Sequence, residues 1–257
     1  MTTLLIDADI VAYKVASTSE RSTDFNRDGN PAVSVDRPRA RREAEKLVNG
    51  YAKKLKADSI IICLTDPDVN WRKEYEPTYK AFRQDTKKPE LLSYVKEYLA
   101  EEYVSFIRPR LEADDIMGIL ATHPRLVEGE KIIVSEDKDM RTIPAKVYNP
   151  NTPKLGVMDI SELDADRFHM WQTIVGDPTD GYIGARGVGK SSHWAEEIIH
   201  ADREELWELV LEAYSFAGLT EDDAIRQARL ARILRAEDYN LKTKGIRLWK
   251  PEKLEIN

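Results

Sequence analysis

Three short apolar runs in this chain each end in an acidic residue. They extend from Leu4 to Asp7, from Ile60 to Asp66 and from Ile132 to Asp137. Runs of this length that are rich in β-branched residues are typical of buried parallel strands, and ligands bind beyond the carboxyl ends of such strands. Carboxylates that are brought together repel one another unless a cation lies among them. The sequence therefore predicts a metal-dependent active site at one edge of a parallel sheet.

The composition favours a soluble protein of one α/β domain, or of a core with a smaller lobe. The chain has 257 residues, of which 33% are charged, and its mean hydropathy is −0.52. No run approaches the roughly 20 apolar residues of a membrane span, and Asp7 and Asp9 interrupt any signal segment. The single cysteine, Cys63, lies in an apolar run, which excludes an intramolecular disulfide. We therefore expect a cytoplasmic protein without a membrane partner.

The order of the apolar patterns predicts a three-layer α/β core followed by helices. Strands are expected at 3–7, 59–65, 103–107, 131–135 and 146–148. Helices are expected to start near 10 and 112, and to span about 38–56 and 91–99; residues 17–37 are expected to form a loop or short hairpin. From about residue 164 the strand patterns stop, and helices are expected near 168–175, 192–199, 202–216 and 220–236.

Three further groups of acids lie beside these elements, and each has an ordinary structural alternative. The groups are Glu112, Asp114 and Asp115; Asp137 and Asp139; and Asp177 and Asp180. Acids in the first turn of a helix complement its dipole, and aspartates commonly close turns. All of these acids together, with the strand-end aspartates, form a stronger hypothesis than any one group. They predict a shared set of metal ligands.

The ligand types select the metal. Carboxylates without accompanying histidine or cysteine favour Mg²⁺ or Mn²⁺ over Zn²⁺, and the four histidines have no zinc-site spacing. The acids exceed the needs of one ion. Two ions about 4 Å apart are the arrangement used in phosphoryl hydrolysis. The sequence thus predicts a two-metal phosphodiester hydrolase.

Basic and aromatic residues supply candidate contacts to a nucleic acid. Arg72, Lys80 and Arg83 are interleaved with Tyr75, Tyr79 and Phe82, which suits stacking on unpaired bases beside phosphate contacts. A second basic stretch covers residues 37–56, and a solvated helix face is its simpler interpretation. The net charge of −7 is a weak objection to a DNA partner, because the local field decides binding.

The segment from Gly184 to Ser191 matches the phosphate-binding pattern G-x-x-x-x-G-K-S. A P-loop must follow a buried strand, whereas helical and turn residues precede this segment, so we reject ATP binding. A glycine-rich turn between two helices can instead bring backbone N–H groups close to DNA phosphates. The candidate DNA-binding residues are Gly184, Arg186, Gly187, Gly189, Lys190 and Ser191.

Taken together, these motifs resemble the 5′-nucleases, which comprise flap endonucleases and phage or bacterial 5′→3′ exonucleases. The matching segments occur in family order between residues 4 and 191. They are Leu5-Ile6-Asp7, Asp66 with Arg72, Tyr79-Lys80 with Arg83, Glu112 to Asp115, Ser135 to Asp139, Gly176 to Asp180, and Gly187 to Lys190.

The resemblance implies a three-layer, PIN-like nuclease core with a mainly parallel sheet at 1–165 and a helical DNA-binding lobe at 166–257. The lobe would contain a helix–three-turn–helix near 168–200. One metal would be held by Asp7, Asp66, Glu112, Asp114 and Asp115, and the second by Asp137, Asp139, Asp177 and Asp180. Lys80 and Arg83 would steady the scissile phosphate with support from Arg72, and a K⁺ ion would lie at the glycine-rich turn.

One departure from the family concerns the helical arch that threads single-stranded 5′ ends. Only residues 84–111 separate the basic segment from Glu112, and most are needed for a helix and a strand. This favours a Mg²⁺-dependent 5′→3′ exonuclease acting on double-stranded DNA at 5′ ends, nicks or flaps, in a bacterial or phage-infected cell. Flap endonuclease or RNase H-like activity on RNA–DNA hybrids, and partners among replication proteins, are further expectations. The alternatives are a PIN-like ribonuclease and a non-catalytic, structure-specific DNA-binding protein.

Overall fold

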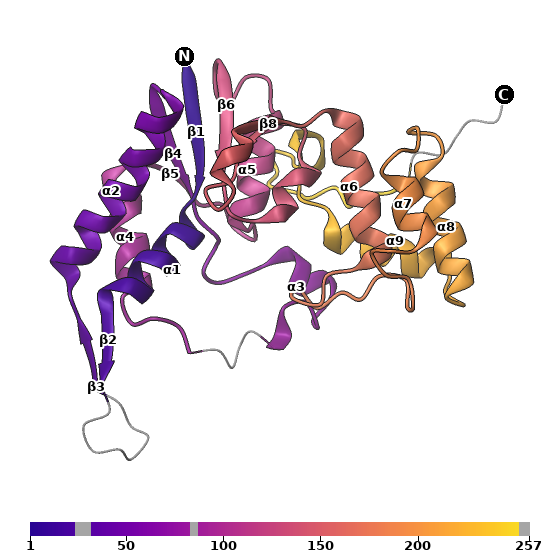
Figure 1. Ribbon diagram of the computed structural model, residues 1–257, viewed down its shortest axis with the longest axis horizontal. Coiled ribbons are helices and arrows are strands. Elements are labelled where there is room, and N and C mark those ends of the chain that lie inside the picture. Colours follow the sequence, from indigo (N-terminus) through magenta and orange to yellow (C-terminus); the bar gives the residue numbers. More distant parts are fainter. Residues whose placement is uncertain (24–31, 83–86, 252–257) are drawn as a thin grey trace.

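The core of the protein is a six-stranded sheet (Figure 1). A computed structural model describes residues 1–23, 32–82 and 87–251. The strand order is β5 (Val104–Phe106), β4 (Ser59–Cys63), β1 (Thr2–Asp7), β6 (Glu130–Val134), β7 (Lys146–Tyr148) and β8 (Val157–Asp159). Every pairing is parallel except that of β8, which is antiparallel to β7. The predicted parallel strands are confirmed, and β8 is an addition that the sequence reading missed.

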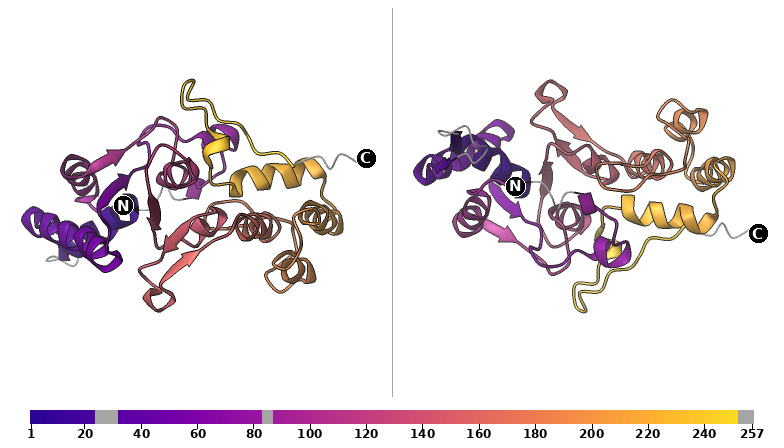
Figure 2. Two further views of the ribbon diagram at one scale, coloured as in Figure 1. Left: turned by 90° about the horizontal axis from the view of Figure 1, so that it is seen from above. Right: turned by 90° about the horizontal axis from the view of Figure 1, so that it is seen from below.

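Both faces of the sheet are covered, which explains the continuous apolar runs within its central strands. Leu4 and Ile6 of β1 pack with α1 (Ala8–Ser19), α2 (Arg37–Leu55) and α4 (Leu92–Glu102). Leu5 points to the other face and packs with α5 (Ala113–Thr122). The views along the strands in Figure 2 show helices on both sides of the sheet. The predicted three-layer α/β core is confirmed.

Two connecting segments of the core had uncertain structure from the sequence. Residues 17–37 include the end of α1 and a hairpin of β2 (Glu20–Thr23) and β3 (Ala32–Val35). Residues 87–111, all of which are described, form α4 and β5 and contain no further helix. Leu91, Val95 and Leu99 are buried against the core, so α4 belongs to the helical layer on one face of the sheet and is not an arch.

The helical lobe begins at α6 (Glu162–Val175) and continues through α7 (His193–Ile198), α8 (Leu206–Phe216) and α9 (Glu221–Ala231). Ile174, Val210, Tyr214 and Ala224 are fully or almost fully buried in its own apolar core. The lobe therefore has a hydrophobic core separate from the two that flank the sheet.

The chain then returns from the lobe to the α/β core. Helix α9 ends at Ala231, earlier than the predicted 236, because Leu234 donates its backbone N–H to Asp115 of α5 at 3.0 Å. Ile233, Leu234 and Tyr239 join the apolar cluster beneath α5. The predicted boundary at residue 165 stays a prediction, but this return segment packs with the core. In the described part of the chain, no helix is long and apolar enough to cross a membrane.

Candidate active site

Three aspartates lie near one another at the carboxyl edge of the sheet, and we call them the first acid group: Asp7, Asp114 and Asp137. Asp7 ends β1, Asp114 lies in the first turn of α5, and Asp137 follows β6. Because β1 and β6 are adjacent and parallel, their carboxyl ends lie side by side. Ser135 donates its hydroxyl to Asp7 Oδ2 at 3.0 Å and so helps to orient that carboxylate.

The first acid group favours a bound cation. Burial, together with the charges of Asp9 and Asp137, raises the pKa of Asp7 to about 7. Burial, together with Asp7 and Asp137, raises the pKa of Asp114 well above its ordinary value. Burial and acidic neighbours thus raise the free energy of each ionised carboxylate. A positive ion among them would remove this repulsion.

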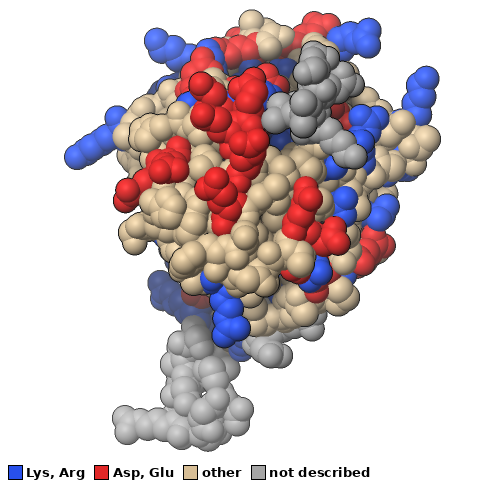
Figure 3. All heavy atoms as spheres, turned by 90° about the vertical axis from the view of Figure 1, so that its right-hand side faces the viewer, with Lys and Arg blue, Asp and Glu red and all other residues tan. Residues whose placement is uncertain are grey.

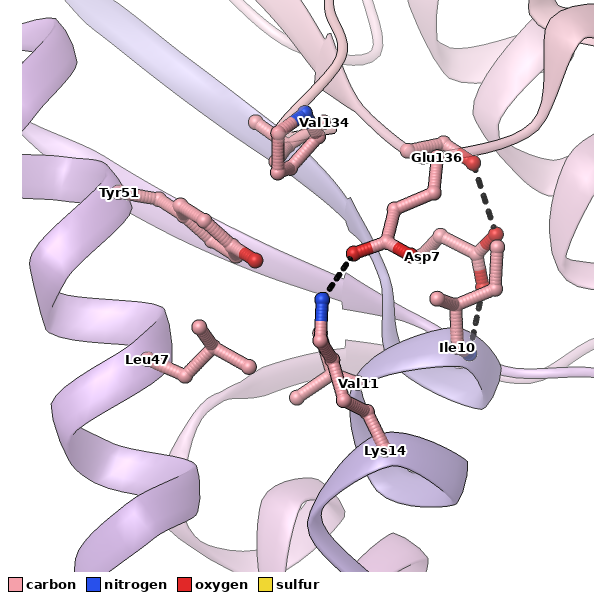
Figure 4. A pocket seen from close by; sticks show the side chains of 10 residues that line it. Asp7, Ile10, Val11, Lys14, Leu47, Tyr51, Val134 and Glu136 are labelled. Atoms are coloured by element: carbon pink, nitrogen blue, oxygen red, sulfur yellow. Dashed lines mark hydrogen bonds and ion pairs between the residues drawn. The ribbon is translucent and has the colours of Figure 1, made fainter. Parts of the chain in front are cut away.

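The cavity beside Asp7 is narrow and has mainly apolar walls (Figure 4). Val11, Leu47 and Val134 line it, and so do Lys14 of α1 and Glu136, which form an ion pair at 2.6 Å. Glu136 lies between Ser135 and Asp137. The ion pair therefore ties the loop that carries two site residues to the helix that begins at Asp7.

Lys80 lies near Asp114 of the first acid group, in a network of buried polar groups. Its ammonium contacts Glu112 Oε1 at 2.8 Å and Asp180 Oδ2 at 3.3 Å. Burial alone would raise the pKa of Glu112, but Lys80 and Arg72 lower it to about 2. Burial opposes the charge on Lys80, but Glu112 and Asp180 raise its pKa above the ordinary value. Both groups are therefore ionised, and Lys80 is held next to Asp114.

Tyr79 has a different role from the one that the sequence suggested. Its side chain is only 2% exposed, and its hydroxyl lies within 3.2 Å of Glu112 and 3.1 Å of Asp180. It cannot stack on an unpaired base, so that interpretation is wrong for Tyr79. Phe82, at 54% exposure, remains accessible.

Arg72 is enclosed by the protein, so its predicted support of the scissile phosphate stays a prediction and would act through neighbouring side chains. The side chain is buried, with 2% of the residue exposed. Its guanidinium donates to Glu112 at 2.7 Å, to both oxygens of Asp115 at 2.8 Å, and to the carbonyls of Leu230 and Arg232. All three guanidinium nitrogens are therefore engaged within the protein. Arg72 joins the core to the end of α9.

The described contacts of Asp115 lie within the protein, and its predicted role as a metal ligand stays a prediction. It is fully buried, and besides Arg72 it accepts hydrogen bonds from Trp71 Nε1 at 2.8 Å and from the backbone of Leu234 at 3.0 Å. Asp114 and Asp115 are neighbours on the first turn of α5, but they point into different surroundings. Neighbouring residues on a helix point in different directions, but the sequence alone does not show which of the two directions faces the site.

Two other predicted residues are not brought into the site by the described contacts. Asp66 accepts the backbone N–H of Arg110 at 2.7 Å and that of Asp68 at 3.2 Å, so its carboxylate closes a turn at the end of β4. A metal-ligand role for Asp66 stays a prediction. Arg83 lies outside the described residues, and its phosphate contact also stays a prediction.

Asp139, Asp177 and Asp180 form the second acid group, at the junction of core and lobe. Asp139 lies in the 3₁₀ helix η2 (Lys138–Thr142) and accepts Gln172 Nε2 of α6 at 2.6 Å. Burial and the charges of Asp137 and Asp180 raise the pKa of Asp139 to about 7. Asp177 is bound to Lys138 at 2.5 Å and to the backbone of Thr179. Asp180 belongs to the same turn and contacts Lys80.

The donor set of both groups fits divalent ions that prefer oxygen. Every candidate ligand is a carboxylate, and two of them have pKa values near 7 through burial and repulsion. Among the described residues, no three acidic, histidine or cysteine side chains converge closely enough to form a complete metal cluster. Lys80 and Lys138 lie between several of the acids instead. Metal binding would therefore require small side-chain movements.

The glycine-rich segment is a turn between α6 and α7, which agrees with the rejection of a P-loop, since no strand precedes it. Arg186, Gly187 and Lys190 are exposed, as are Gly189 and Ser191. Gly184 is buried with φ of +66°, and a Cβ there would lie 2.5 Å from the nitrogen of Gly176. Gly184 therefore allows two backbone segments to meet, and its predicted contact with DNA stays a prediction.

The negative charge of the chain is concentrated on the outer side of the helical lobe. Residues 193–223 contain ten acidic residues and one basic residue, Arg203, whereas the whole chain has a net charge of −7. Figure 3 shows acidic side chains gathered across this end of the molecule. The remainder of the chain is net positive, and α2 carries Arg37 and Arg41 over the rings of Tyr94 and Tyr98. A polyanion would be repelled by the outer lobe and attracted elsewhere.

Comparison with known proteins identifies the family. The family model of the 5′-3′ exonuclease N-terminal resolvase-like domain matches residues 2–166. This chain belongs to the 5′→3′ exonuclease family. The exonuclease of Escherichia phage T7 is 32% identical over 96% of this chain and 93% of its own, and the exodeoxyribonuclease of Enterobacteria phage T3 is 32% identical over 96% and 92%.

Solved structures of related fold support the same conclusion for the architecture of this chain. The phage T5 D15 protein, co-crystallised with metal ions, matches with a TM-score of 0.61 at 15% identity, covering 90% of this chain and 89% of the T5 chain. A complex of the D15 flap endonuclease with DNA and metal ions gives 0.53. The expected 5′-nuclease family, its PIN-like core and its nuclease class are confirmed.

Sequence reasoning missed several residues that shape the site. Ser135 orients Asp7, Gln172 binds Asp139, and Trp71 binds Asp115. Ser135 lies inside the Ser-Glu-Asp-Lys-Asp motif and could have been found there. Gln172 and Trp71 come from elements distant in sequence, and no pattern in the chain indicates their partners.

Proposed function

We propose that this protein is a divalent-metal-dependent 5′→3′ exonuclease that hydrolyses phosphodiester bonds of double-stranded DNA from 5′ ends or nicks. The observation that carries the proposal is the first acid group at the sheet edge, with Lys80 beside it. The phage T7 and T3 relatives, named exonuclease and exodeoxyribonuclease, support the same activity. The metal-bound structures of the T5 D15 protein support dependence on a divalent ion.

The two acid groups would hold two ions, Mg²⁺ or alternatively Mn²⁺. Asp7, Asp114 and Asp137 would bind one ion, and Asp139, Asp177 and Asp180 the other. When bound, such ions supply Lewis acidity that activates water and offsets the charge developing on the phosphate. Glu112 stays ionised because Lys80 and Arg72 surround it, and it holds Lys80 in position.

Lys80 would contact a non-bridging oxygen of the scissile phosphate. Its side chain is 14% exposed, and it is held between Glu112 and Asp180. Its backbone is in the left-handed region, with φ of +53°, and its N–H donates to the carbonyl of Asp180 at 2.9 Å. Such a fixed ammonium stabilises negative charge on the phosphate without reorganising during the reaction. Arg83 would assist from the same segment.

The turn between α6 and α7 would hold the duplex backbone. Arg186, Lys190 and Ser191 are exposed there and supply charge and hydrogen-bond donors. A K⁺ ion at this turn is part of the proposal. The acidic outer side of the lobe would face away from the DNA, since it would repel phosphates.

Exonuclease action is favoured over the threading of flaps, because α4 is packed into the core. Flap cleavage remains the second activity of the proposal, since a T5 D15 structure is described as that of a flap endonuclease. Cleavage of RNA–DNA hybrids, recruitment by replication proteins, and a cytoplasmic location in a bacterial or phage-infected cell complete it.

The test uses a nicked duplex labelled at the 5′ end of the nick in one sample and at the 3′ end in another, with Mg²⁺ or with EDTA. Early, Mg²⁺-dependent release of 5′-labelled mononucleotides is expected. Labelled fragments released only when a single-stranded flap is present would mean endonuclease action instead. Release that is equally fast in EDTA, or only from RNA, would contradict the proposal.

A further inference from the structure

Lys138 lies among the carboxylates of the second acid group. Its ammonium is 2.5 Å from Asp177 Oδ2 and 3.8 Å from Asp139 Oδ1. The Lys138 side chain is 52% exposed, whereas those of Asp177 and Asp139 are 5% and 15% exposed. A half-exposed cation thus contacts two nearly buried anions from the solvent side.

The surroundings of these two anions leave little other positive charge. Gln172 donates to Asp139, and the backbone of Thr179 donates to Asp177, but both donors are neutral. Asp137 and Asp180 add further negative charge near Asp139. Among the described contacts, Lys138 is the cation that neutralises Asp177. The next ammonium, that of Lys80, is bound to Glu112 and Asp180.

A divalent ion at the second acid group would need the oxygen that Lys138 now binds. An ammonium and a metal ion cannot share Asp177 Oδ2 at bonding distance without strong repulsion between them. The long, half-exposed stem of Lys138 allows the ammonium to move into solvent, whereas the carboxylates are fixed by packing and hydrogen bonds.

We propose that Lys138 is an internal counter-ion that holds the second acid group together without metal and is displaced when a divalent ion binds there. Lys138 is thus a positioning residue that sets the metal concentration needed to fill this group. The inference rests on the metal dependence in the proposed function. The new element is a competition between Lys138 and the divalent ion for the carboxylate of Asp177.

The experiment compares Mn²⁺ binding by the wild-type protein with that by Lys138→Met and by the control Lys146→Met, in the absence of DNA. Lys146 pairs with Glu130 at the same distance, 2.5 Å, but at the start of β7, away from both acid groups. Isothermal titration and the electron paramagnetic resonance signal of free Mn²⁺ give the number of sites and their affinities. Thermal unfolding in EDTA gives the stability of each metal-free protein.

The wild-type protein is expected to bind Mn²⁺ at two sites, and Lys138→Met to bind the weaker one roughly fivefold more tightly, as suits a partly exposed charged hydrogen bond. Lys138→Met should also melt at a lower temperature in EDTA, and Lys146→Met should leave Mn²⁺ affinity unchanged. Unchanged or weaker Mn²⁺ binding by Lys138→Met would overturn this inference alone. A wild-type protein that binds no Mn²⁺ would overturn the proposed metal dependence itself.

Discussion

Replacing each of the two adjacent aspartates at the start of α5 should have opposite effects. Asp115 accepts four hydrogen bonds of 3.0 Å or less, from Trp71, from Arg72 twice and from Leu234. Asparagine keeps one acceptor oxygen and turns an N–H toward donors. The buried guanidinium of Arg72 would then lose part of the negative charge that balances its own charge. Breaking a buried ion pair on one side costs about 3–5 kcal/mol, so we expect Asp115→Asn to lose about that much free energy of unfolding.

Asp114→Asn should behave differently, because the folded state already disfavours the Asp114 charge. Its pKa is raised by burial and by Asp7 and Asp137, so ionising Asp114 at pH 7 lowers the stability of the folded protein. A neutral asparagine removes that repulsion. We expect Asp114→Asn to be at least as stable as the wild-type protein in EDTA, but to bind Mn²⁺ weakly and to lose most DNA cleavage.

Urea unfolding in EDTA and Mn²⁺ titration of both variants test this contrast. Asp115→Asn should retain Mn²⁺ binding at temperatures at which it remains folded. If Asp115→Asn is as stable as the wild-type protein and loses Mn²⁺, then Asp115 is a metal ligand and its structural assignment is wrong. If Asp114→Asn is strongly destabilised, the repulsion argued for the first acid group does not exist.

Three further predictions concern other parts of the chain. Lys80→Ala should slow DNA cleavage by about 100-fold or more, and Lys53→Ala, an exposed change on α2, should have little effect. Equal cleavage rates of the two variants at saturating DNA would mean that Lys80 contributes only to DNA binding. Gly184→Ala should cost at least about 2 kcal/mol in urea unfolding, because its Cβ would meet the backbone of Gly176, whereas Gly187→Ala, also at positive φ but in open space, should cost about 1 kcal/mol. Burial and then Arg232 lower the pKa of His169 well below 6.5, so the unfolded chain gains a proton first as the pH falls. Stability should therefore decline below about pH 6.5, by up to about 1.4 kcal/mol per pH unit, and His169→Gln should flatten this slope between pH 7.5 and 5.5.

The parallel strands could be predicted from the apolar runs in the sequence. A strand segment buried on both faces is a continuous apolar run, and the central residues of β1, β4 and β6 carry that pattern directly. The placement of Asp7 at the end of β1 and of Asp137 beyond β6 follows from the same pattern, because neighbouring parallel strands end at one edge of the sheet. The short strand β8 escaped prediction because it has only three residues, and its pairing with β7 is tertiary.

The sequence by itself determined the sheet, the helical lobe, and a set of acids gathered at one edge, since these depend on local periodicity and strand direction. Only the tertiary structure decided which acids are free to bind metal. Asp114 and Asp115 are identical in type and adjacent, but the turn of α5 directs Asp115 toward Arg72 and the returning backbone of Leu234. Asp114 instead faces Asp7 and Asp137. The environment of each carboxylate depends on segments distant in sequence, more than 40 residues away for the partners of Asp115, which local patterns do not encode.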